Sequence, residues 1–276
     1  MAKTTVYKSS WIADGFDILF SVIYLLEKHK DLCVPLNKIS TEGILSDVIV
    51  YWTHNKTSGT AELKDYKMEY PGGVEKFKKT LNTCLSNKSR FIIIPLGIKF
   101  STGSGGHFNI LLIDKHNKSI ERFEPYGVES KRDLKIMTEF EKKFKQMFDS
   151  IKTKPEYKFF SSNEIWSEKG LQYVEEHAVD NSMGTALNLD SDPFGYCIAW
   201  SIYYVDMRLS NPDIKPKELI GIIKTNLKKY RHSLRTFIRN YSSFLVKEKN
   251  KFLKSLNIYL NRSISSGNPA NFSKNI

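Results

Sequence analysis

Between residues 91 and 126, short and mainly apolar runs are separated by polar segments, and this pattern predicts the strands of a sheet. Residues 91–98 and 108–114 are short apolar runs typical of largely buried strands, and the second run follows a segment rich in glycine and serine. A polar turn at 115–118 leads to residues 120–124, where apolar and charged side chains alternate. The last two runs therefore predict an antiparallel hairpin.

Several other stretches carry apolar side chains at the spacing of a helix, with charged residues at the remaining positions. This amphipathic pattern predicts four helices around the hairpin and two more helical segments near the C-terminus. The four are residues 10–29, 74–85, 130–151 and 197–209, and the C-terminal segments are 218–244 and 245–260. A sheet combined with such helices predicts an α+β fold.

The remaining segments give weaker patterns. Residues 44–52 suit a strand or a helix by propensity alone, so both stay open. Residues 53–73 are polar and contain glycine and proline, which predicts a loop, and residues 161–193 predict an irregular acidic loop. A short strand is expected within 154–160.

The length of 276 residues suits one domain with extensions at both ends. We predict a core at 89–212, an N-terminal helical or mixed extension at 1–88, and a basic helical extension at 213–276. No apolar run approaches the roughly 20 residues that cross a bilayer, and residues 1–8 lack the apolar segment of a signal peptide. We therefore expect an intracellular protein without a membrane span.

The chain is basic, since 42 Lys and Arg against 30 Asp and Glu give a formal net charge of +12. Such a charge suits an acidic partner, for example nucleic acid or an acidic protein surface. The basic residues are spread widely rather than gathered in a nucleic-acid-binding motif, which favours an ordinary solvated surface. The C-terminal helical segments still offer a candidate basic cluster, formed by Lys228, Lys229, Arg231, Arg235 and Arg239.

The three cysteines, Cys33, Cys84 and Cys197, are an odd number without a Cys-x-x-Cys pair. We therefore expect reduced thiols, no zinc site, and no partner for Cys33 or Cys84. Cys197 differs because it follows Gly195 and Tyr196 at the predicted start of a helix, where the helix dipole favours a thiolate. The alternative for a cysteine in an apolar sequence is a buried structural role.

His107 is the best placed of the six histidines, because it follows a Gly-Gly pair at the start of the predicted hairpin. Antiparallel pairing brings it to the same end of the hairpin as Glu124, where a base and its orienting acid can meet. Periodicity does not choose between Glu124 and Glu121 for this acid, so both stay open. No spacing of histidines or carboxylates indicates a metal site, and no cofactor is expected.

The order histidine, acid, cysteine resembles that of the superfamily of SUMO- and ubiquitin-like-protein-specific cysteine proteases and adenovirus proteases. The resemblance lies within residues 89–210, in Gly-His-Phe-Asn-Ile-Leu-Leu-Ile-Asp-Lys, Glu-Arg-Phe-Glu-Pro-Tyr-Gly and Gly-Tyr-Cys-Ile-Ala-Trp, and is closest to versions from large DNA viruses. It implies a papain-like cysteine protease fold with a central mixed sheet and the cysteine at the N-terminus of a central helix. It also implies that Cys197 is the nucleophile, His107 the general base and Glu124 the orienting acid.

The chain departs from the family pattern at three places. Phe108 replaces the tryptophan that usually follows the histidine, and Glu124 is one methylene longer than the usual aspartate or asparagine. The glutamine that donates to the oxyanion usually lies shortly before the cysteine. Here the nearest candidate is Gln172, and an inserted loop at 174–190 separates it from the cysteine.

The implied activity is that of a thiol protease cleaving after Gly-Gly or Gly-x, as a deubiquitinase, a SUMO deconjugase or a viral enzyme that processes structural precursors. The narrow substrate slot of such enzymes is lined by aromatic side chains, for which the candidates are Trp200, Phe108 and Trp166. The expected partner is ubiquitin, a ubiquitin-like protein or a viral precursor, in the host cytoplasm or the virion. The alternative is a catalytically silent module that binds nucleic acid or a protein through its basic C-terminal helices.

Overall fold

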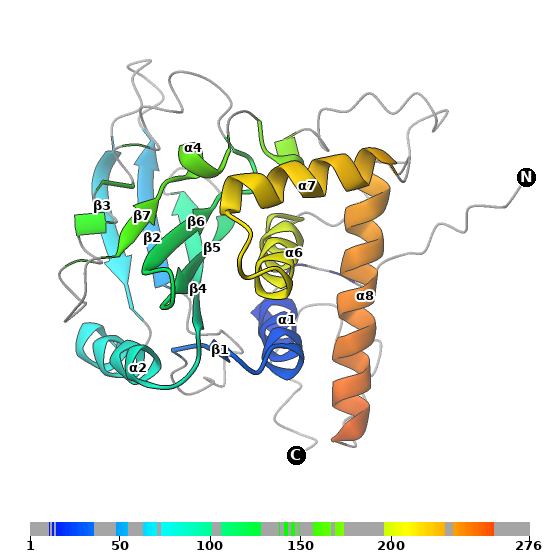
Figure 1. The fold of residues 1–276 in the computed structure, drawn as a ribbon. Helices are drawn as coiled ribbons and strands as arrows, with labels where there is room; N and C mark the ends of the chain where they lie inside the picture. The colour runs from blue at the N-terminus through cyan, green and yellow to red at the C-terminus, as the bar shows by residue number, and fades with distance from the viewer. Residues whose placement is uncertain are drawn as a thin grey trace, which may run out of the picture.

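A mixed sheet forms the centre of the molecule (Figure 1). The structure is a computed structural model, and it describes residues 11, 13, 15–35, 48–54, 63–70, 73–100, 106–127, 138, 141–142, 145–146, 149, 157–166, 169–173, 196–229 and 234–256. The strands are β1 Leu32–Cys33, β2 Val48–His54, β3 Leu63–Glu69, β4 Phe91–Phe100, β5 Gly106–Asp114, β6 Ser119–Phe123 and β7 Lys158–Phe160. They lie in the order β3, β2, β4, β5, β6 and β7. The short strand β1 pairs with the start of β4, and β2 pairs with the later part of β4.

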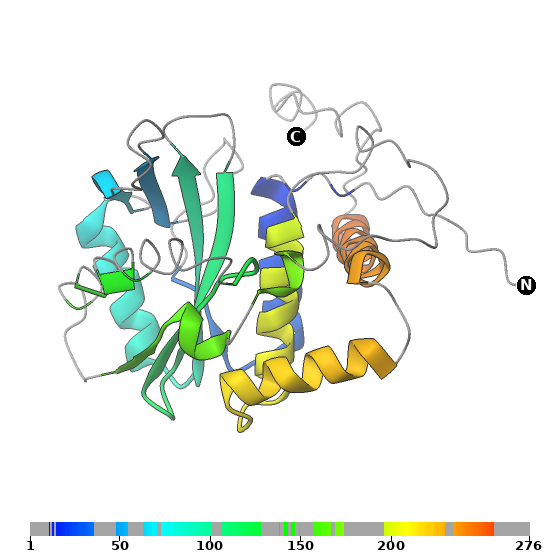
Figure 2. The ribbon, with the colours of Figure 1, turned by 90° about the horizontal axis from the view of Figure 1, so that it is seen from above.

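Helices cover both faces of the sheet. They are α1 Gly15–Lys28, α2 Val74–Ser86, α4 Ser162–Ile165, α6 Tyr196–Ser210, α7 Pro216–Lys229 and α8 Leu234–Ser255. Figure 2 shows α2 on one side of the sheet and α1 with α6 on the other, and α8 packs on the outside of α1 and α6. Within the described ranges, no helix combines the length and the apolar character needed to cross a bilayer.

This layering explains the run of isoleucines in β4. Phe91 and Ile93 belong to the apolar cluster formed with α1, α6 and α8, whereas Ile92 and Ile94 belong to the cluster formed with α2. All four side chains are buried. A strand that is covered on both faces reads as a continuous apolar run rather than an alternating one, which is the pattern in the sequence.

Helix α6 is buried on nearly all sides. It contacts β5, α1, α7 and α8, and Tyr204 stacks on Phe123 of β6 with ring centroids 4.1 Å apart. A helix surrounded by protein needs no polar face, so apolar residues occur all around it. The packing fixes the N-terminus of α6, and the cysteine that it carries, relative to the sheet.

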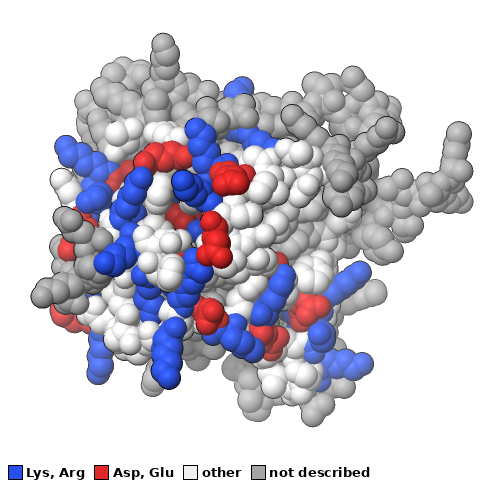
Figure 3. Space-filling model, viewed as in Figure 1, with Lys and Arg blue, Asp and Glu red and all other residues white. Residues whose placement is uncertain are grey.

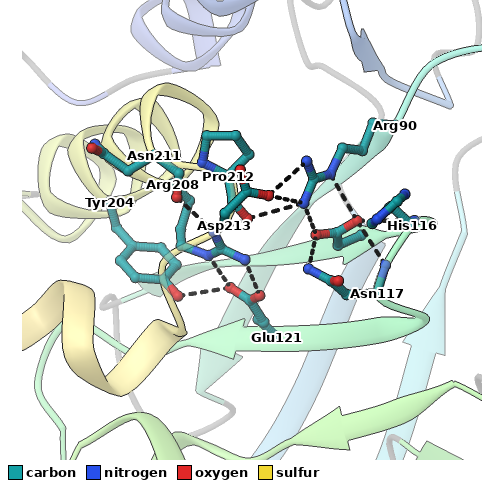
Figure 4. A network of polar contacts seen from close by, with 10 residues as sticks. Arg90, His116, Asn117, Glu121, Tyr204, Arg208, Asn211, Pro212 and Asp213 are labelled. Atoms are coloured by element: carbon teal, nitrogen blue, oxygen red, sulfur yellow. Dashed lines mark hydrogen bonds and ion pairs between the residues drawn. The ribbon is translucent and has the colours of Figure 1, made fainter.

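A buried ion pair also joins α6 to the hairpin (Figure 4). Arg208 donates to both carboxylate oxygens of Glu121 in β6, at 2.8 and 3.0 Å. Tyr204 donates to the same carboxylate at 2.8 Å, and Arg90 binds Asp114 at the start of the hairpin turn. A bidentate guanidinium–carboxylate contact has a strict geometry, so it holds α6 at one position along β6.

Most predicted elements are confirmed. The hairpin is β5 and β6, the strand expected at 91–98 is β4, and the helices expected at 10–29, 74–85 and 197–209 are α1, α2 and α6. The α+β class with a mixed sheet and a cysteine in the first turn of a central helix is confirmed as well. Residues 44–52, which the sequence left open, include the start of a strand, β2.

Three segments differ from the prediction. The expected loop at 53–73 contains β3, and the expected loop at 161–193 contains α4 and a helical turn at 171–173. The break expected between 244 and 245 is wrong, because α8 runs through these positions and the break lies between α7 and α8.

Two other elements are described only in part. The strand expected within 154–160 is confirmed as β7. Within the helix expected at 130–151, the described positions are helical, namely 138, 141, 142, 145, 146 and 149, and the others lie outside the described residues.

The division into core and extensions stays a prediction. Strands β1, β2 and β3 come from the predicted N-terminal extension but belong to the same sheet as β4–β7. Helix α8 comes from the predicted C-terminal extension and packs on α1 and α6. Both predicted extensions therefore contribute elements that pack directly on the predicted core.

Cys33 and Cys84 form a disulfide, so the expectation of two reduced, unpartnered thiols is wrong. Cys33 ends β1 and pairs with Ile92 near the start of β4, while Cys84 lies near the end of α2, shortly before β4 begins. The two Cα atoms are 5.7 Å apart although the residues are separated by 51 positions in the sequence. The pairing arises where β1 and α2 meet at one end of β4, which cysteine spacing alone does not reveal.

Candidate active site

The start of β5 and the end of β6 bring His107 and Glu124 together. The antiparallel register pairs Ile110 with Phe123, which sets Glu124 level with Asn109, two residues from His107 on the same face of β5. The Nε2 atom of His107 lies 2.5 Å from the Oε1 atom of Glu124. The hairpin thus joins the histidine to one of the two acids that the sequence offered.

Glu121, the other acid, points toward α6 instead. Its carboxylate is fully buried and accepts hydrogen bonds from Tyr204 and Arg208 (Figure 4). It lies level with Leu112, an odd number of positions from His107, so the two side chains leave β5 and β6 on opposite faces.

A tight turn holds Glu124 in place. The segment Glu124-Pro125-Tyr126-Gly127 carries proline at its second position and glycine at its fourth, a pattern typical of a type I turn. The backbone N–H of Gly127 donates to the carbonyl oxygen of Glu124 at 3.0 Å. The backbone N–H of Tyr126 donates to Oε1 of the Glu124 side chain at 3.0 Å. The backbone conformation therefore directs one carboxylate oxygen toward the histidine.

Cys197 lies in the first turn of α6, is buried, and is the only cysteine of the chain outside the disulfide. Its side chain forms a hydrogen bond with His107. Because Glu124 occupies Nε2 of the imidazole, Nδ1 is the nitrogen that remains for the sulfur. The arrangement is a cysteine–histidine–glutamate chain of contacts in which a helix N-terminus faces the end of a hairpin.

The ionised forms of His107 and Glu124 stabilise each other. Burial by itself lowers the pKa of His107, but the negative charge of Glu124 and hydrogen bonds to Cys197 and Glu124 outweigh it and raise that pKa from 6.5 to about 10. Burial by itself raises the pKa of Glu124, but the charge and hydrogen bond of His107, with help from Arg122, lower it from 4.5 to about 2. At neutral pH the imidazole is therefore protonated and the carboxylate ionised.

Gln172 lies on a short helical turn that packs against the turn carrying Glu124. Its backbone N–H donates to the carbonyl oxygen of Pro125 at 3.1 Å, and the N–H of Gly170 donates to the carbonyl oxygen of Tyr126 at 2.7 Å. A Cβ atom on Gly170 would lie 2.1 Å from the Pro125 oxygen, so only glycine permits this approach. The side chain of Gln172 is buried. The structure thus anchors the backbone of Gln172 next to the acid.

The three aromatic residues expected in a substrate slot are buried in the structure. Trp200, Trp166 and Phe108 have exposed fractions of 0%, 1% and 4%, and all three belong to the main apolar cluster. Trp200 stacks on Phe237 of α8, and Trp166 packs against Phe123. Their part in a substrate slot stays a prediction.

Two buried charged residues lie beside the site and are not predicted by the sequence pattern. Arg122 is fully buried and contacts both Asn109 and Glu124, and Glu141 accepts a hydrogen bond from Nε of Arg122 at 3.0 Å. Arg122 lies in a strand with alternating charged residues, a pattern that indicates one solvent-facing side. Every residue of β6 is buried, so the pattern gave no sign of this pair.

Among the described residues, no group of three or more histidine, cysteine, aspartate or glutamate side chains gathers in a way that would hold a metal ion.

No known protein-family profile matches the chain. A sequence relative is a putative ankyrin repeat protein, L371, of Acanthamoeba polyphaga mimivirus, which is 32% identical over 197 residues. The match covers 67% of this chain but only 24% of the relative, so the chain spans about a quarter of that protein's length.

Three solved structures, all bacterial effector proteins, show some likeness. Cdu1 of Chlamydia trachomatis, solved bound to ubiquitin, matches with a TM-score of 0.45 and 13% identity, covering 91% of this chain and 96% of that one. ChlaDUB1 of the same organism has a TM-score of 0.44 and 10% identity, covering 90% and 86%. RavZ of Legionella pneumophila has a TM-score of 0.28 and 11% identity, covering 82% and 62%. Similarity at this level assigns no function to the chain.

Proposed function

We propose that this chain is a cysteine peptidase in which Cys197 is the nucleophile, His107 the general base and acid, and Glu124 the residue that orients His107. The observation that carries the proposal is the continuous contact from the Cys197 sulfur through the imidazole to the Glu124 carboxylate. An adjacent base that is itself held by a third group is what activates a thiol for attack.

The reaction starts from the thiolate of Cys197 and the imidazolium of His107. The sulfur attacks the carbonyl carbon of the scissile bond, and His107 gives its proton to the leaving amine as the tetrahedral intermediate collapses to a thioester. His107 then removes a proton from water, which attacks the thioester and releases the carboxylate product. The sulfur returns as a thiolate, and Glu124 stabilises the imidazolium whenever it forms.

We further propose that Gln172 donates a hydrogen bond to the oxyanion. In support, its backbone is anchored to the turn that carries Glu124, with Gly170 allowing the close approach. A donor at this place contributes roughly 2.7–4 kcal/mol to the stability of the tetrahedral intermediate in comparable enzymes. Replacing it with alanine in a protein that still folds should therefore lower kcat.

For the substrate we propose the glycine-ended tail of ubiquitin or a ubiquitin-like protein, and a viral structural precursor as the alternative. The order of the three residues along the chain supports the first choice, and the match to a mimivirus protein supports a viral setting for either. We place the activity inside the cell, in the host cytoplasm or the virion.

A ubiquitin or SUMO probe that ends in a propargylamide tests this proposal. The purified chain should form a covalent adduct with one of these probes, because the thiolate adds to the alkyne held at the position of the scissile bond. Cys197→Ala, which keeps the fold and removes the sulfur, should give none. An intact chain that labels with no such probe and cleaves no precursor peptide would lack the proposed activity.

The alternative of a silent basic binding module has less support. Figure 3 shows lysine and arginine side chains interspersed with acidic ones over the face seen in Figure 1. Lys228 and Lys229 end α7, while Arg235 and Arg239 of α8 are half-buried and already engaged in interactions; Arg231 lies outside the described residues. Nucleic-acid binding stays a prediction, which binding at increasing salt concentration would test.

A further inference from the structure

Behind the histidine lies a buried run of charged side chains that alternate in sign. Nε of Arg122 is 3.0 Å from Oε1 of Glu141, Nη1 of Arg122 is 3.5 Å from Oε2 of Glu124, and Oε1 of Glu124 is 2.5 Å from His107. The side chains of Glu141, Arg122, Glu124 and His107 are exposed by only 6%, 0%, 5% and 15%. The run ends at the thiol of Cys197, which forms a hydrogen bond with His107.

A fully buried arginine on β6 is costly, because removing one ion from water costs several kcal/mol unless it is well paired. The position itself does not demand charge, since its partner in the register is Leu111. Arg122 instead bonds to Asn109 of the neighbouring strand and to Glu141. Glu141 is held in turn by the backbone N–H of Ser162 at 2.7 Å.

The two oxygens of the Glu124 carboxylate have different partners. Oε1 faces His107 and the N–H of Tyr126, whereas Oε2 faces Arg122. A glutamate has one more rotatable bond than an aspartate, so a contact on its second oxygen is needed to fix the plane of the carboxylate. Arg122 supplies that contact from a position that Glu141 and Asn109 hold rigid.

We propose that Arg122, held by Glu141, is a positioning residue that aims the Glu124 carboxylate at His107. This rests on the proposed roles of Cys197, His107 and Glu124 in peptide cleavage. A merely structural ion pair would affect stability alone, whereas a positioning pair also sets the pH range in which Cys197 is reactive. The electrostatics agree, because Arg122 is among the groups that lower the pKa of Glu124.

The test is the pH dependence of Cys197 alkylation in the double variant Arg122→Gln/Glu141→Gln. This change removes both charges at once, so the net charge of the protein is unchanged. Iodoacetamide reports the thiolate without any substrate, and Cys33 and Cys84 do not react because they form a disulfide. Among the described residues, the charged groups that face Glu124 are His107 and Arg122, with Glu141 and Cys197 one contact further.

We expect the acid side of the alkylation profile to move to higher pH in the double variant, because the Glu124 carboxylate loses the contact on Oε2 that directs Oε1 toward His107. A carboxylate that is no longer held in this direction supports the imidazolium, and with it the thiolate, less well. Labelling by the ubiquitin or SUMO probe at low pH should slow in parallel, and the maximal rate of adduct formation should change more than the probe concentration that gives half of that rate.

The matched control is Glu121→Gln/Arg208→Gln. This control also removes one positive and one negative charge from a buried ion pair that involves β6. The pair joins Glu121 of β6 to Arg208 of α6 and does not contact Glu124. We expect it to lower stability while leaving the alkylation profile where it is in the wild type. An unchanged profile in folded Arg122→Gln/Glu141→Gln, or an equal shift in both double variants, would overturn the inference.

Should the double variant not fold, Arg122→Lys gives the same measurement. Its single ammonium keeps the charge but cannot contact Asn109, Glu141 and Glu124 together, so we expect a smaller shift in the same direction; no shift contradicts the inference. The proposed function fails separately. If Cys197 of the wild type shows no enhanced reactivity near neutral pH, the proposed peptidase mechanism is wrong. If its reactivity is enhanced and depends on Arg122 but no probe labels it, only the proposed substrate is wrong.

Discussion

Two glutamates three positions apart on one hairpin have entirely different surroundings. Glu121 is fixed between Tyr204 and Arg208 of α6, and Glu124 is fixed between His107 and Arg122. Periodicity could not separate them, because a strand pattern gives the faces but not which face meets the histidine. The separation comes from the register and from the turn after Phe123, both of which are properties of the folded hairpin.

The two glutamates should respond in opposite ways to the same substitution. Glu124→Gln removes the charge that stabilises the imidazolium, so kcat should fall by about 100-fold or more, with a modest change in stability. Glu121→Gln leaves Arg208 buried without its counter-charge, so the free energy of unfolding should fall by about 3–5 kcal/mol.

Probe labelling and urea unfolding of both variants measure these effects side by side. The folded fraction of Glu121→Gln should label at close to the wild-type rate. A Glu124→Gln variant with full activity, or a folded Glu121→Gln variant that is inactive, would show that the acid has been assigned to the wrong residue.

How much of the site the sequence predicts depends on the kind of residue. Cys197 and His107 stand out because a thiol at a helix start and a histidine at a strand start are local patterns. Arg122 and Glu141 do not, because a charged residue that is buried in a strand or in a helix has the same sequence pattern as an exposed one. The burial of Trp166 and Trp200 was equally invisible, since tryptophans line slots and fill cores alike.

At the scale of elements, α8 is the piece that holds the helical layer together. Lys249 of α8 donates to Asp17 of α1 at 2.7 Å, and the two side chains are exposed by 13% and 1%. Asp17 also accepts a hydrogen bond from the backbone N–H of Ala13. The contact therefore ties the first and last helices of the described chain to each other.

Breaking that contact should loosen α8. Lys249→Met removes one charged partner of the buried Asp17 carboxylate, so we expect the free energy of unfolding to fall by about 1–3 kcal/mol in urea titrations. Lys251→Met, on the same helix, is the control: its side chain is 80% exposed and pairs with Glu248 at 3.6 Å, so its effect should stay within about 0.5 kcal/mol. Equal effects of the two substitutions would mean that the α1–α8 contact contributes nothing.

The elements that the sequence missed have physical reasons for being missed. Strand β3, Leu63–Glu69, is an edge strand with four charged residues among its seven, and such edges lack the apolar pattern of a central strand. The break between α7 and α8 contains neither glycine nor proline, so no helix-stop signal marks it and the periodic pattern was read through.

At the scale of the whole molecule, the disulfide is the feature that agrees least with an intracellular setting. Disulfides are rare where cellular thiols keep cysteines reduced. Cys33 and Cys84 nevertheless join β1 to α2 at the end of β4, across 51 positions of sequence.

Reduction of this bond should lower the free energy of unfolding by about 2–4 kcal/mol, because it releases a long closed loop in the unfolded chain. Guanidinium titrations with and without dithiothreitol measure the difference, and Cys33→Ala/Cys84→Ala should be insensitive to the reductant. Cys197 should stay reactive in all three forms. A count of three free thiols in the denatured, unreduced protein would show that the bond is absent.

Helix α6 carries the thiol at its first turn and fills the core along the rest of its length. During synthesis, the hairpin with His107 and Glu124 emerges from the ribosome well before this helix does. A nascent chain at that stage has the imidazole and the carboxylate but not the thiol. The three groups meet only when α6 docks on the sheet, so the step that completes the core also assembles the candidate site.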